Sequence, residues 1–287
     1  MIECYSFKNR DAFRGAGTAE KIPFEPDLGN ASVGRRCEIF YGRIRCNGVR
    51  PFFYGRRLRA HEFPRQSGMT RTVYIISGGT IADAAWVKKI LDREANAAII
   101  CADGGARYCE ALGLIPSVII GDMDSIDEDL LSVYEAKGSK ILRYPRSKNE
   151  TDTELALIHA LSLTPHRIRI VGALGSRIDH GLANISLLVA GVIQGVDIRI
   201  FDDCSELFVV NGSATIRGAP GQTVSLLPLA EEATGITLSG FEYPLADARM
   251  EQGHPYGISN RLTGSEGHIS VKTGYLLVIH YRQMPRE

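Results

Sequence analysis

The residues with the clearest chemical potential are five aspartates that follow predicted strands or open the next helices: Asp103, Asp122, Asp124, Asp152 and Asp179. The ligand site of an open parallel sheet lies beyond the carboxyl ends of its strands, so we expect these side chains at one edge. Clustered carboxylates repel one another unless a cation joins them. Their oxygens suit Mg²⁺, which usually combines one or two protein carboxylates with phosphate oxygens. The pattern therefore predicts a magnesium site.

Any single aspartate also has a structural interpretation, as a helix N-cap or first-turn residue stabilised by the helix dipole. This interpretation is favoured for Asp127 and Asp129. It stays open for Asp152, where a capping motif already explains the local sequence. Asp122 and Asp124 differ, because two aspartates flanking one apolar residue at a strand end do nothing obvious for packing. In an extended turn both could reach one ion.

A second group of residues has the composition of a phosphate site. The run Gly172-Ala173-Leu174-Gly175-Ser176-Arg177 follows a predicted strand and enters a helix, whose N-terminus offers unpaired N–H groups to an anion. Arg177 adds a planar guanidinium. Lys148 and Asn149 form another polar cluster, which by itself is typical of an exposed loop. Neither a Walker A nor a GxGxxG pattern occurs in the chain.

Short apolar strands alternate with helices in the middle of the chain. The predicted strands are Thr72–Ile76, Ala97–Cys101, Ser117–Ile120, Ile141–Leu142, Ile168–Val171 and Ile198–Phe201. Helix start signals occur at Thr80 with Asp83 and at Ser125 with Glu128, and later helices are predicted over Thr151–Leu163 and Asp179–Val192. This alternation predicts a parallel sheet covered by helices on both faces.

The pattern changes after about Cys204. Short strand-like runs then follow one another without a long helical period: Leu207–Val210, Ala214–Arg217, Thr223–Leu227, Thr234–Leu238, His268–Lys272 and Tyr275–Ile279. Closely spaced strands of this kind indicate a sandwich or barrel. The predicted fold class is therefore α/β, with a three-layer domain at 69–204 followed by an all-β sandwich at 205–287.

Residues 1–68 differ from the rest of the chain. They carry 13 Lys and Arg against 7 Asp and Glu, and their apolar residues follow no helix or strand period. Such a segment buries too little apolar area to offset its ordering entropy, which favours a disordered basic extension. A true start at Met69 is part of this interpretation. A targeting or regulatory arm and a small ordered element are the alternatives. Acidic residues argue against a mitochondrial transit peptide.

The overall composition is that of a globular protein. Lys and Arg balance Asp and Glu at 33 each, which gives no reason to expect nucleic acid as the main partner. No apolar run reaches the roughly 18 residues that a membrane-spanning helix needs. The six cysteines form no CxxC pair, so a zinc site is not indicated and a reducing, cytoplasmic location is expected.

With these motifs in their order, the sequence resembles the thiamine pyrophosphokinase family. The matching segments are Asp103–Ala106, Gly121–Ser125, Lys148–Asp152, Gly172–His180 and, in the predicted sandwich, Gly257–Asn260. The resemblance covers residues 72–279. It implies a homodimer that transfers pyrophosphate from ATP to the hydroxyl of thiamine, giving thiamine diphosphate and AMP, with Mg²⁺ as cofactor.

The resemblance also implies residue roles. Asp122, Asp124 and Asp152 would hold Mg²⁺, Arg177 would offset charge on the transferring group, and Asp179 would orient Arg177 or act as a further ligand. Residues implied in nucleotide binding are Asp103, Gly104, Gly105, Lys148, Asn149, Thr151, Gly172, Gly175, Ser176 and His180. His180 is equally a base or a helix-start residue. Tyr256, Ser259 and Asn260 would bind thiamine, with the site shared between two subunits.

Two other functions fit part of the pattern. One is a Mg²⁺-dependent nucleotide phosphohydrolase, against which the second domain argues, because water needs no binding domain. The other is a non-enzymatic nucleotide or thiamine sensor, against which the retention of every candidate ligand argues.

The composition break near Met69 leads to a first prediction. A chain that starts at Met69 should fold and keep its full activity, because residues 1–68 lack the apolar periodicity of a structural element. Purified full-length and shortened proteins should be compared in thermal unfolding and in thiamine diphosphate synthesis. Loss of solubility or of most activity would make the first segment structural.

Overall fold

The computed structural model describes residues 72–92, 94 and 97–283, together with the secondary structure of 37–40 and 43–46. The chain divides into two units, Met1–Arg59 and Ala60–Glu287. In the first unit, β1 (Cys37–Phe40) pairs with β2 (Arg43–Cys46) as an antiparallel hairpin. The remainder of the predicted extension at 1–68 lies outside the described residues, so its role stays a prediction.

The second unit begins with a parallel sheet of apolar strands. Its six strands are β3 (Thr72–Ile76), β4 (Ala98–Ala102), β5 (Val118–Gly121), β6 (Lys140–Arg143), β7 (Arg167–Val171) and β8 (Asp197–Phe201). They lie in the order β8-β7-β3-β4-β5-β6. Strands β4, β5 and β6 therefore follow on one side of β3, and β7 and β8 follow on the other side, so the strand order reverses between β3 and β7. This switch point is where an open α/β sheet forms its ligand crevice.

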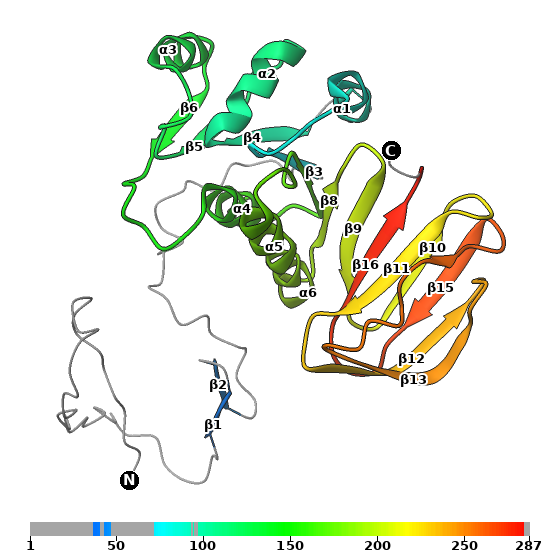
Figure 1. Ribbon diagram of the computed structural model, residues 1–287. Helices are drawn as coiled ribbons and strands as arrows, with labels where there is room; N and C mark the ends of the chain where they lie inside the picture. Colours follow the sequence, from blue (N-terminus) through cyan, green and yellow to red (C-terminus); the bar gives the residue numbers. More distant parts are fainter. Residues whose placement is uncertain (1–36, 41–42, 47–71, 93, 95–96, 284–287) are drawn as a thin grey trace, which may run out of the picture. The chain divides into compact units, whose positions relative to one another are not determined.

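Helices cover both faces of the parallel strands (Figure 1). One face carries α1 (Ala84–Leu91), α2 (Ala106–Leu112) and α3 (Glu128–Ala136), and the other carries α4 (Asp152–Ser162), α5 (Ile178–Leu187) and α6 (Val189–Gln194). Side chains alternate along β3: Val73 and Ile75 pack with α4, whereas Tyr74 and Ile76 pack with α1 and α2. The three-layer α/β prediction is therefore confirmed.

The sandwich part uses eight more strands. They are β9 (Ser205–Val210), β10 (Ser213–Arg217), β11 (Thr223–Pro228), β12 (Glu232–Ser239), β13 (Leu245–Glu251), β14 (Asn260–Arg261), β15 (Glu266–Ser270) and β16 (Leu276–Tyr281). The order β10-β15-β12-β13 forms one sheet. The other four continue the parallel sheet, because β9 pairs antiparallel with β8, and the result is a ten-stranded sheet. A tight turn makes this possible, with Asp202 N–H donating to the Ser205 carbonyl at 3.0 Å.

Several local details differ from the sequence-based expectation. Asp83, and not Thr80, caps α1 by accepting from the Trp86 N–H. The expected capping box at the start of α3 does not form, because the Ser125 hydroxyl donates to Asp124 instead and Asp127 occupies the cap position. The long helix expected to Val192 is two helices, and strands β13 and β14 were not predicted. None of the helices in the described residues is long and apolar enough to cross a membrane.

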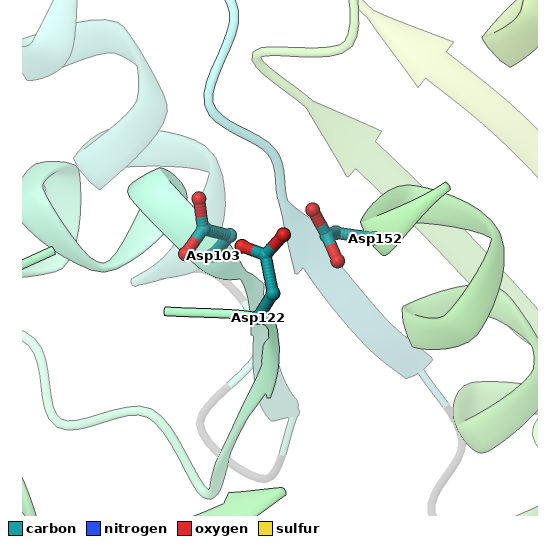
Figure 2. Close-up of side chains that lie close together, drawn as sticks. All are labelled: Asp103, Asp122 and Asp152. Carbon is teal, nitrogen blue, oxygen red and sulfur yellow. The ribbon is translucent and has the colours of Figure 1, made fainter. Parts of the chain in front are cut away.

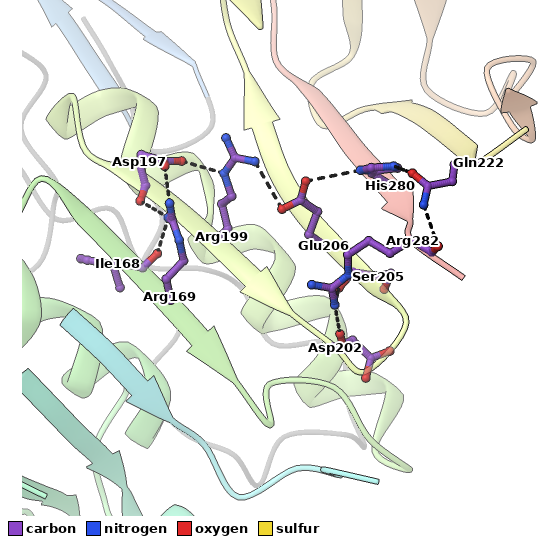
Figure 3. Close-up of polar contacts among 10 residues, drawn as sticks. All are labelled: Ile168, Arg169, Asp197, Arg199, Asp202, Ser205, Glu206, Gln222, His280 and Arg282. Atoms are coloured by element: carbon purple, nitrogen blue, oxygen red, sulfur yellow. Dashed lines mark hydrogen bonds and ion pairs between the residues drawn. The ribbon is translucent and has the colours of Figure 1, made fainter. Parts of the chain in front are cut away.

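A polar network ties the parallel half of the long sheet to the sandwich half (Figure 3). Arg199 on β8 bonds Asp197 at 2.9 Å and Glu206 on β9 at 3.3 Å. Glu206 lies 3.4 Å from the ring of His280 on β16, whose other nitrogen lies 2.9 Å from Gln222. Adjacent strands of the two halves are thus joined by side chains as well as by backbone hydrogen bonds.

Glu206 gives this network a predictable pH dependence. Burial alone would raise the pKa of its carboxyl, but the hydrogen bond with His280 and the charges of Arg199 and Arg282 outweigh burial and leave the pKa lowered. A lowered folded-state pKa means that the contribution to stability is present above the ordinary glutamate pKa of about 4.3. It is lost as the pH falls through the folded-state value.

Glu206→Gln should therefore lower the free energy of unfolding at pH 7 by about 1–3 kcal/mol, since charged hydrogen bonds are lost. The difference from the parent protein should shrink below pH about 4. Urea unfolding across this pH range measures both. Glu266→Gln is the control, because Glu266 pairs with the exposed Arg217 and should cost less than about 1 kcal/mol. A pH-independent difference would contradict the electrostatic explanation.

Candidate active site

A cleft of about 680 Å³ opens at the carboxyl edge of the parallel strands, across the switch point between β3 and β7. Its lining comes from the segments that follow β3, β4, β5 and β7 and from the start of α4. Residues 77–80, 102–104 and 172–177 supply most of the wall, together with Asp122, Asp124 and Thr151–Thr153. The cleft therefore lies where the aspartates were expected to gather.

Three carboxylates converge in this cleft: Asp103 after β4, Asp122 after β5 and Asp152 at the start of α4. One oxygen of each lies within 4.8 Å of the others, and Figure 2 shows the three side chains pointing toward one another. Asp103 is 7% exposed, and its Oδ1 accepts no hydrogen bond from the described residues. Burial raises the pKa of Asp152; the nearby Lys148 ammonium opposes this effect, and the negative charges of Asp103 and Asp122 add to it. Such a cluster favours a bound cation.

The backbone is shaped to allow this convergence. Gly121 ends β5 with no side chain, and a Cβ there would stand 2.8 Å from the Cβ of Asp103 and 3.2 Å from Asp152 Oδ1. Asp103 and Met123 both have positive φ angles, 41° and 62°, which L-residues rarely adopt. Residues held in such conformations cluster at ligand sites. The strained turns after β4 and β5 therefore hold the aspartates in position.

Asp124 is not among the three converging carboxylates, although its spacing from Asp122 predicted that both could reach one ion. The turn at Met123 directs it toward the loop after β6, where it accepts from Arg146 at 2.7 Å. Hydrogen bonds from Ser125 and Arg146 lower the pKa of Asp124. Asp124 lines the same cleft, whereas Asp103 is the third member of the converging group. The two-residue spacing does keep the aspartates close, because Asp124 N–H donates to Asp122 Oδ1 at 3.2 Å and Arg146 contacts both carboxylates.

Two basic residues approach the cluster from the same loop. Lys148 is 10% exposed, and its Nζ lies 2.9 Å from Asp152 Oδ1 and 3.8 Å from Asp122 Oδ2. The contact between the Lys148 ammonium and Asp152 Oδ1 is therefore a close ion pair. Arg146, with an exposed side chain, also lies 4.0 Å from Asp122. Sequence reasoning missed Arg146, whose only signal was its place two residues before Lys148.

The loops after β3 and β7 form the other wall. Gly79 N–H donates to the Gly172 carbonyl at 2.7 Å, and Thr80 N–H donates to the Leu174 carbonyl at 2.7 Å. A Cβ on Gly79 would lie 2.4 Å from both carbonyl oxygens, so only glycine permits this pairing. The predicted Gly172–Arg177 segment, which includes Gly175 and Ser176, thus lines the cleft. Residues 77–80 also line it, although the sequence pattern singled out only Thr80, as a helix start signal.

Arg177 and Asp179 form an exposed bidentate pair at the start of α5. The Arg177 Nη2 donates to Asp179 Oδ2 at 2.5 Å and its Nε donates to Oδ1 at 3.2 Å. The Arg177 hydrogen bond lowers the pKa of Asp179 to about 2. Arg177 and His180 line the cleft. Of the two roles expected for Asp179, the geometry favours orienting Arg177.

The remaining predicted residues divide into two sets. Gly104 lines the cleft, Gly105 is buried behind it and Thr151 caps α4, whereas Asn149 is exposed and lines no part of the cleft. Tyr256, Ser259 and Asn260 belong to the sandwich and are also absent from the lining. No sandwich residue in the described part of the chain contributes to it.

The sandwich residues nevertheless form a defined turn. Ser259 has a φ of 60°, and its N–H donates to the Ser225 hydroxyl at 3.0 Å. Asn260 is buried, and its amide bonds the backbone N–H and carbonyl of Tyr243 at 3.0 and 2.8 Å. The Tyr256 hydroxyl donates to the Arg249 carbonyl while its ring stays exposed. Asn260 therefore holds the turn in shape, and Tyr256 presents an aromatic surface.

Comparisons with known proteins cover both halves of the second unit. The thiamin pyrophosphokinase catalytic domain model matches residues 91–200, and the thiamin pyrophosphokinase vitamin B1 binding domain model matches residues 213–276. Thiamine pyrophosphokinase from Bacillus subtilis is 35% identical over 169 residues, which cover 58% of this chain and 79% of that protein. Thiamine pyrophosphokinase 2 from Oryza sativa subsp. japonica is 26% identical over 216 residues, 64% of this chain and 78% of that protein.

Solved structures agree with the sequence relatives. The crystal structure of thiamine pyrophosphokinase from Bacillus subtilis matches with a TM-score of 0.67 and 30% identity, over 74% of this chain and 100% of that one. The thiamin pyrophosphokinase of Geobacillus thermodenitrificans matches with a TM-score of 0.65 and 28% identity, over 74% and 98%. Sequence, domain order and fold agree, and the chain belongs to the thiamine pyrophosphokinase family.

Proposed function

We propose that this enzyme transfers pyrophosphate from ATP to the hydroxyl of thiamine, giving thiamine diphosphate and AMP, in a Mg²⁺-dependent reaction. The observation that carries the proposal is the convergence of Asp103, Asp122 and Asp152 in a glycine-lined cleft at the sheet's switch point. The family membership of both halves supports it. A nucleotide phosphohydrolase would not need the vitamin B1 binding domain that residues 213–276 match.

The residues present fit a magnesium ion. Asp103, Asp122 and Asp152 supply only oxygen ligands, and the buried Oδ1 of Asp103 has no hydrogen bond among the described residues. When bound, Mg²⁺ would neutralise negative charge on the polyphosphate, which is the main requirement of phosphoryl-type transfer. Asp124, bonded to Arg146, would hold the loop after β6 over the site.

The other wall of the cleft would bind the phosphates. The α5 N-terminus and the backbone of Gly172–Ser176 face the cleft, where N–H groups attract anions. Asp179 holds the Arg177 guanidinium in a bidentate pair, so Arg177 would meet the transferring group in a fixed orientation. Thiamine's hydroxyl would attack the β-phosphorus in line with the departing AMP, and alignment rather than a strong base would dominate the rate.

The thiamine site would be completed by a second copy of the chain. Among the described residues, no aromatic side chain of the sandwich lines the cleft of its own chain. Tyr243, Tyr256 and Ile258 instead expose apolar surface on the sandwich. Beside the cleft, α5 exposes Ile178 and Leu182, at 76% and 61%. In a two-fold dimer these surfaces would meet twice and form two shared sites.

Free Cys101, Cys109 and Cys204 fit a reducing cytoplasmic location.

The proposed reaction is tested directly by its products. Incubation of the purified protein with ATP, thiamine and Mg²⁺ should yield thiamine diphosphate and AMP in equal amounts by mass spectrometry. Asp122→Asn should reduce turnover by at least about 100-fold, the scale of losing one preorganised electrostatic contact. Thiamine monophosphate with ADP, or phosphate release without thiamine, would refute the reaction.

Metal affinity should distinguish the role of Asp103 from that of Asp124. Asp103→Asn removes a converging carboxylate, so Mn²⁺, used as a probe for Mg²⁺, should bind at least about tenfold more weakly, a change of 1.4 kcal/mol. Asp124→Asn should change the affinity much less, because Asp124 faces Arg146. Titration followed by electron paramagnetic resonance measures both. Equal losses in the two variants would place Asp124 among the ligands.

The shared site is tested by mixing subunits. Asp122→Asn damages the cleft, and Asn260→Ala removes the bonds that hold the sandwich turn to Tyr243, so each homodimer should be nearly inactive. A mixed dimer would carry both defects in one site and none in the other, and should regain about half the parent activity per dimer. Circular dichroism checks that both variants are folded. If mass analysis confirms exchange and no activity returns, each site lies within one chain.

A further inference from the structure

Lys148 occupies an unusual place for a lysine. Its side chain is 10% exposed, and its ammonium lies 2.9 Å from Asp152 Oδ1 and 3.8 Å from Asp122 Oδ2. Asp122 and Asp152 are two of the three carboxylates that we propose as ligands of the metal ion. The ammonium and a metal ion would therefore use the same oxygens.

Charge balance explains why the lysine lies there. Three carboxylates with oxygens within 4.8 Å repel one another, and partial burial of the cluster makes a paired cation more important. Lys148 is placed to supply that cation, because its ammonium contacts Asp122 and Asp152. A divalent ion on Asp122 and Asp152 would repel an ammonium at this distance strongly, because repulsion is weakly screened away from bulk water. The two cations therefore exclude each other.

We propose that Lys148 is an internal counter-ion of the carboxylate cluster, which a metal ion must displace in order to bind. The proposal rests on the proposed function, because it concerns the same cluster. Lysine has a flexible four-carbon stem, so its ammonium can leave the carboxylates without backbone movement. The exchange keeps the cluster stable when no metal is present and holds the affinity for free metal low, so that metal enters together with nucleotide phosphates that offer further oxygens.

The test compares Lys148→Met with the parent protein in the absence of nucleotide. Lys148→Met should bind Mn²⁺ at least about tenfold more tightly in a titration followed by electron paramagnetic resonance, a gain of 1.4 kcal/mol. In a chelator the same variant should unfold at a lower temperature, because the carboxylates have lost their cation. Lys148→Arg keeps the charge, so its Mn²⁺ affinity and its unfolding temperature in a chelator should both stay close to those of the parent protein.

Lys88→Met is the matched control. Lys88 forms an i,i+4 pair with Asp92 at 3.2 Å, the same spacing as Lys148 and Asp152, but on the exposed surface of α1. Its removal should leave Mn²⁺ affinity unchanged. If Lys148→Met does not fold, Lys148→Gln removes the charge and keeps a polar side chain.

Unchanged or weaker Mn²⁺ binding by a folded neutral variant would overturn the proposal, as would the absence of detectable Mn²⁺ binding to that variant. Failure of the proposed function is a different result, because the parent protein would then make no thiamine diphosphate with Mg²⁺ and ATP. A parent protein that makes thiamine diphosphate, together with a Lys148→Met variant of unchanged Mn²⁺ affinity, would reject only the counter-ion.

Discussion

Mutual repulsion among Asp103, Asp122 and Asp152 is the constraint on which the rest of this site depends. Their oxygens lie within 4.8 Å of one another, which carboxylates tolerate only with a cation and a backbone that holds them in place. The backbone meets this requirement with adjacent parallel strands, β4 and β5, and with the first turn of α4 packed against them. Gly121 allows the strand ends to approach, and the positive φ of Asp103 turns its carboxylate into the cleft.

The same sheet connects this site to the sandwich. Because β9 pairs with β8, the parallel strands and half of the sandwich form one ten-stranded sheet. Arg199, Glu206 and His280 reinforce the junction through charged and polar contacts across β8, β9 and β16. The two halves are therefore one continuous structural unit, although their sequence patterns differ.

Sequence patterns predicted the features that depend on short-range periodicity. The apolar runs of β3, β7 and β8 were placed to within one residue, and the Thr151 cap of α4 forms as the sequence indicates. What the sequence could not supply were features decided by tertiary contacts. Strand β13 escaped prediction because its charged, half-exposed residues pair with β12 and lack an apolar run.

The candidate site shows the same division between local and tertiary information. The motifs named the right segments, since most of the predicted nucleotide-binding residues line one cleft. The motifs could not predict side-chain contacts: the Asp124 carboxylate pairs with Arg146, and only the folded chain brings Asp103 beside Asp122. Arg146 and residues 77–80 were missed because a lone arginine and a Ser-Gly-Gly turn have no distinctive sequence signal.

The central claim is that Asp103, Asp122 and Asp152 together hold the metal ion that serves pyrophosphate transfer. Crystals of the full chain grown with Mn²⁺ and a non-hydrolysable ATP analogue would test it most directly, because anomalous scattering locates manganese independently of the refined protein. We predict an anomalous peak bonded to oxygens of these three aspartates and of the phosphates, with the Lys148 ammonium moved away from Asp152. A peak held by Asp124 without Asp103, or manganese bound only to phosphate, would contradict the claim.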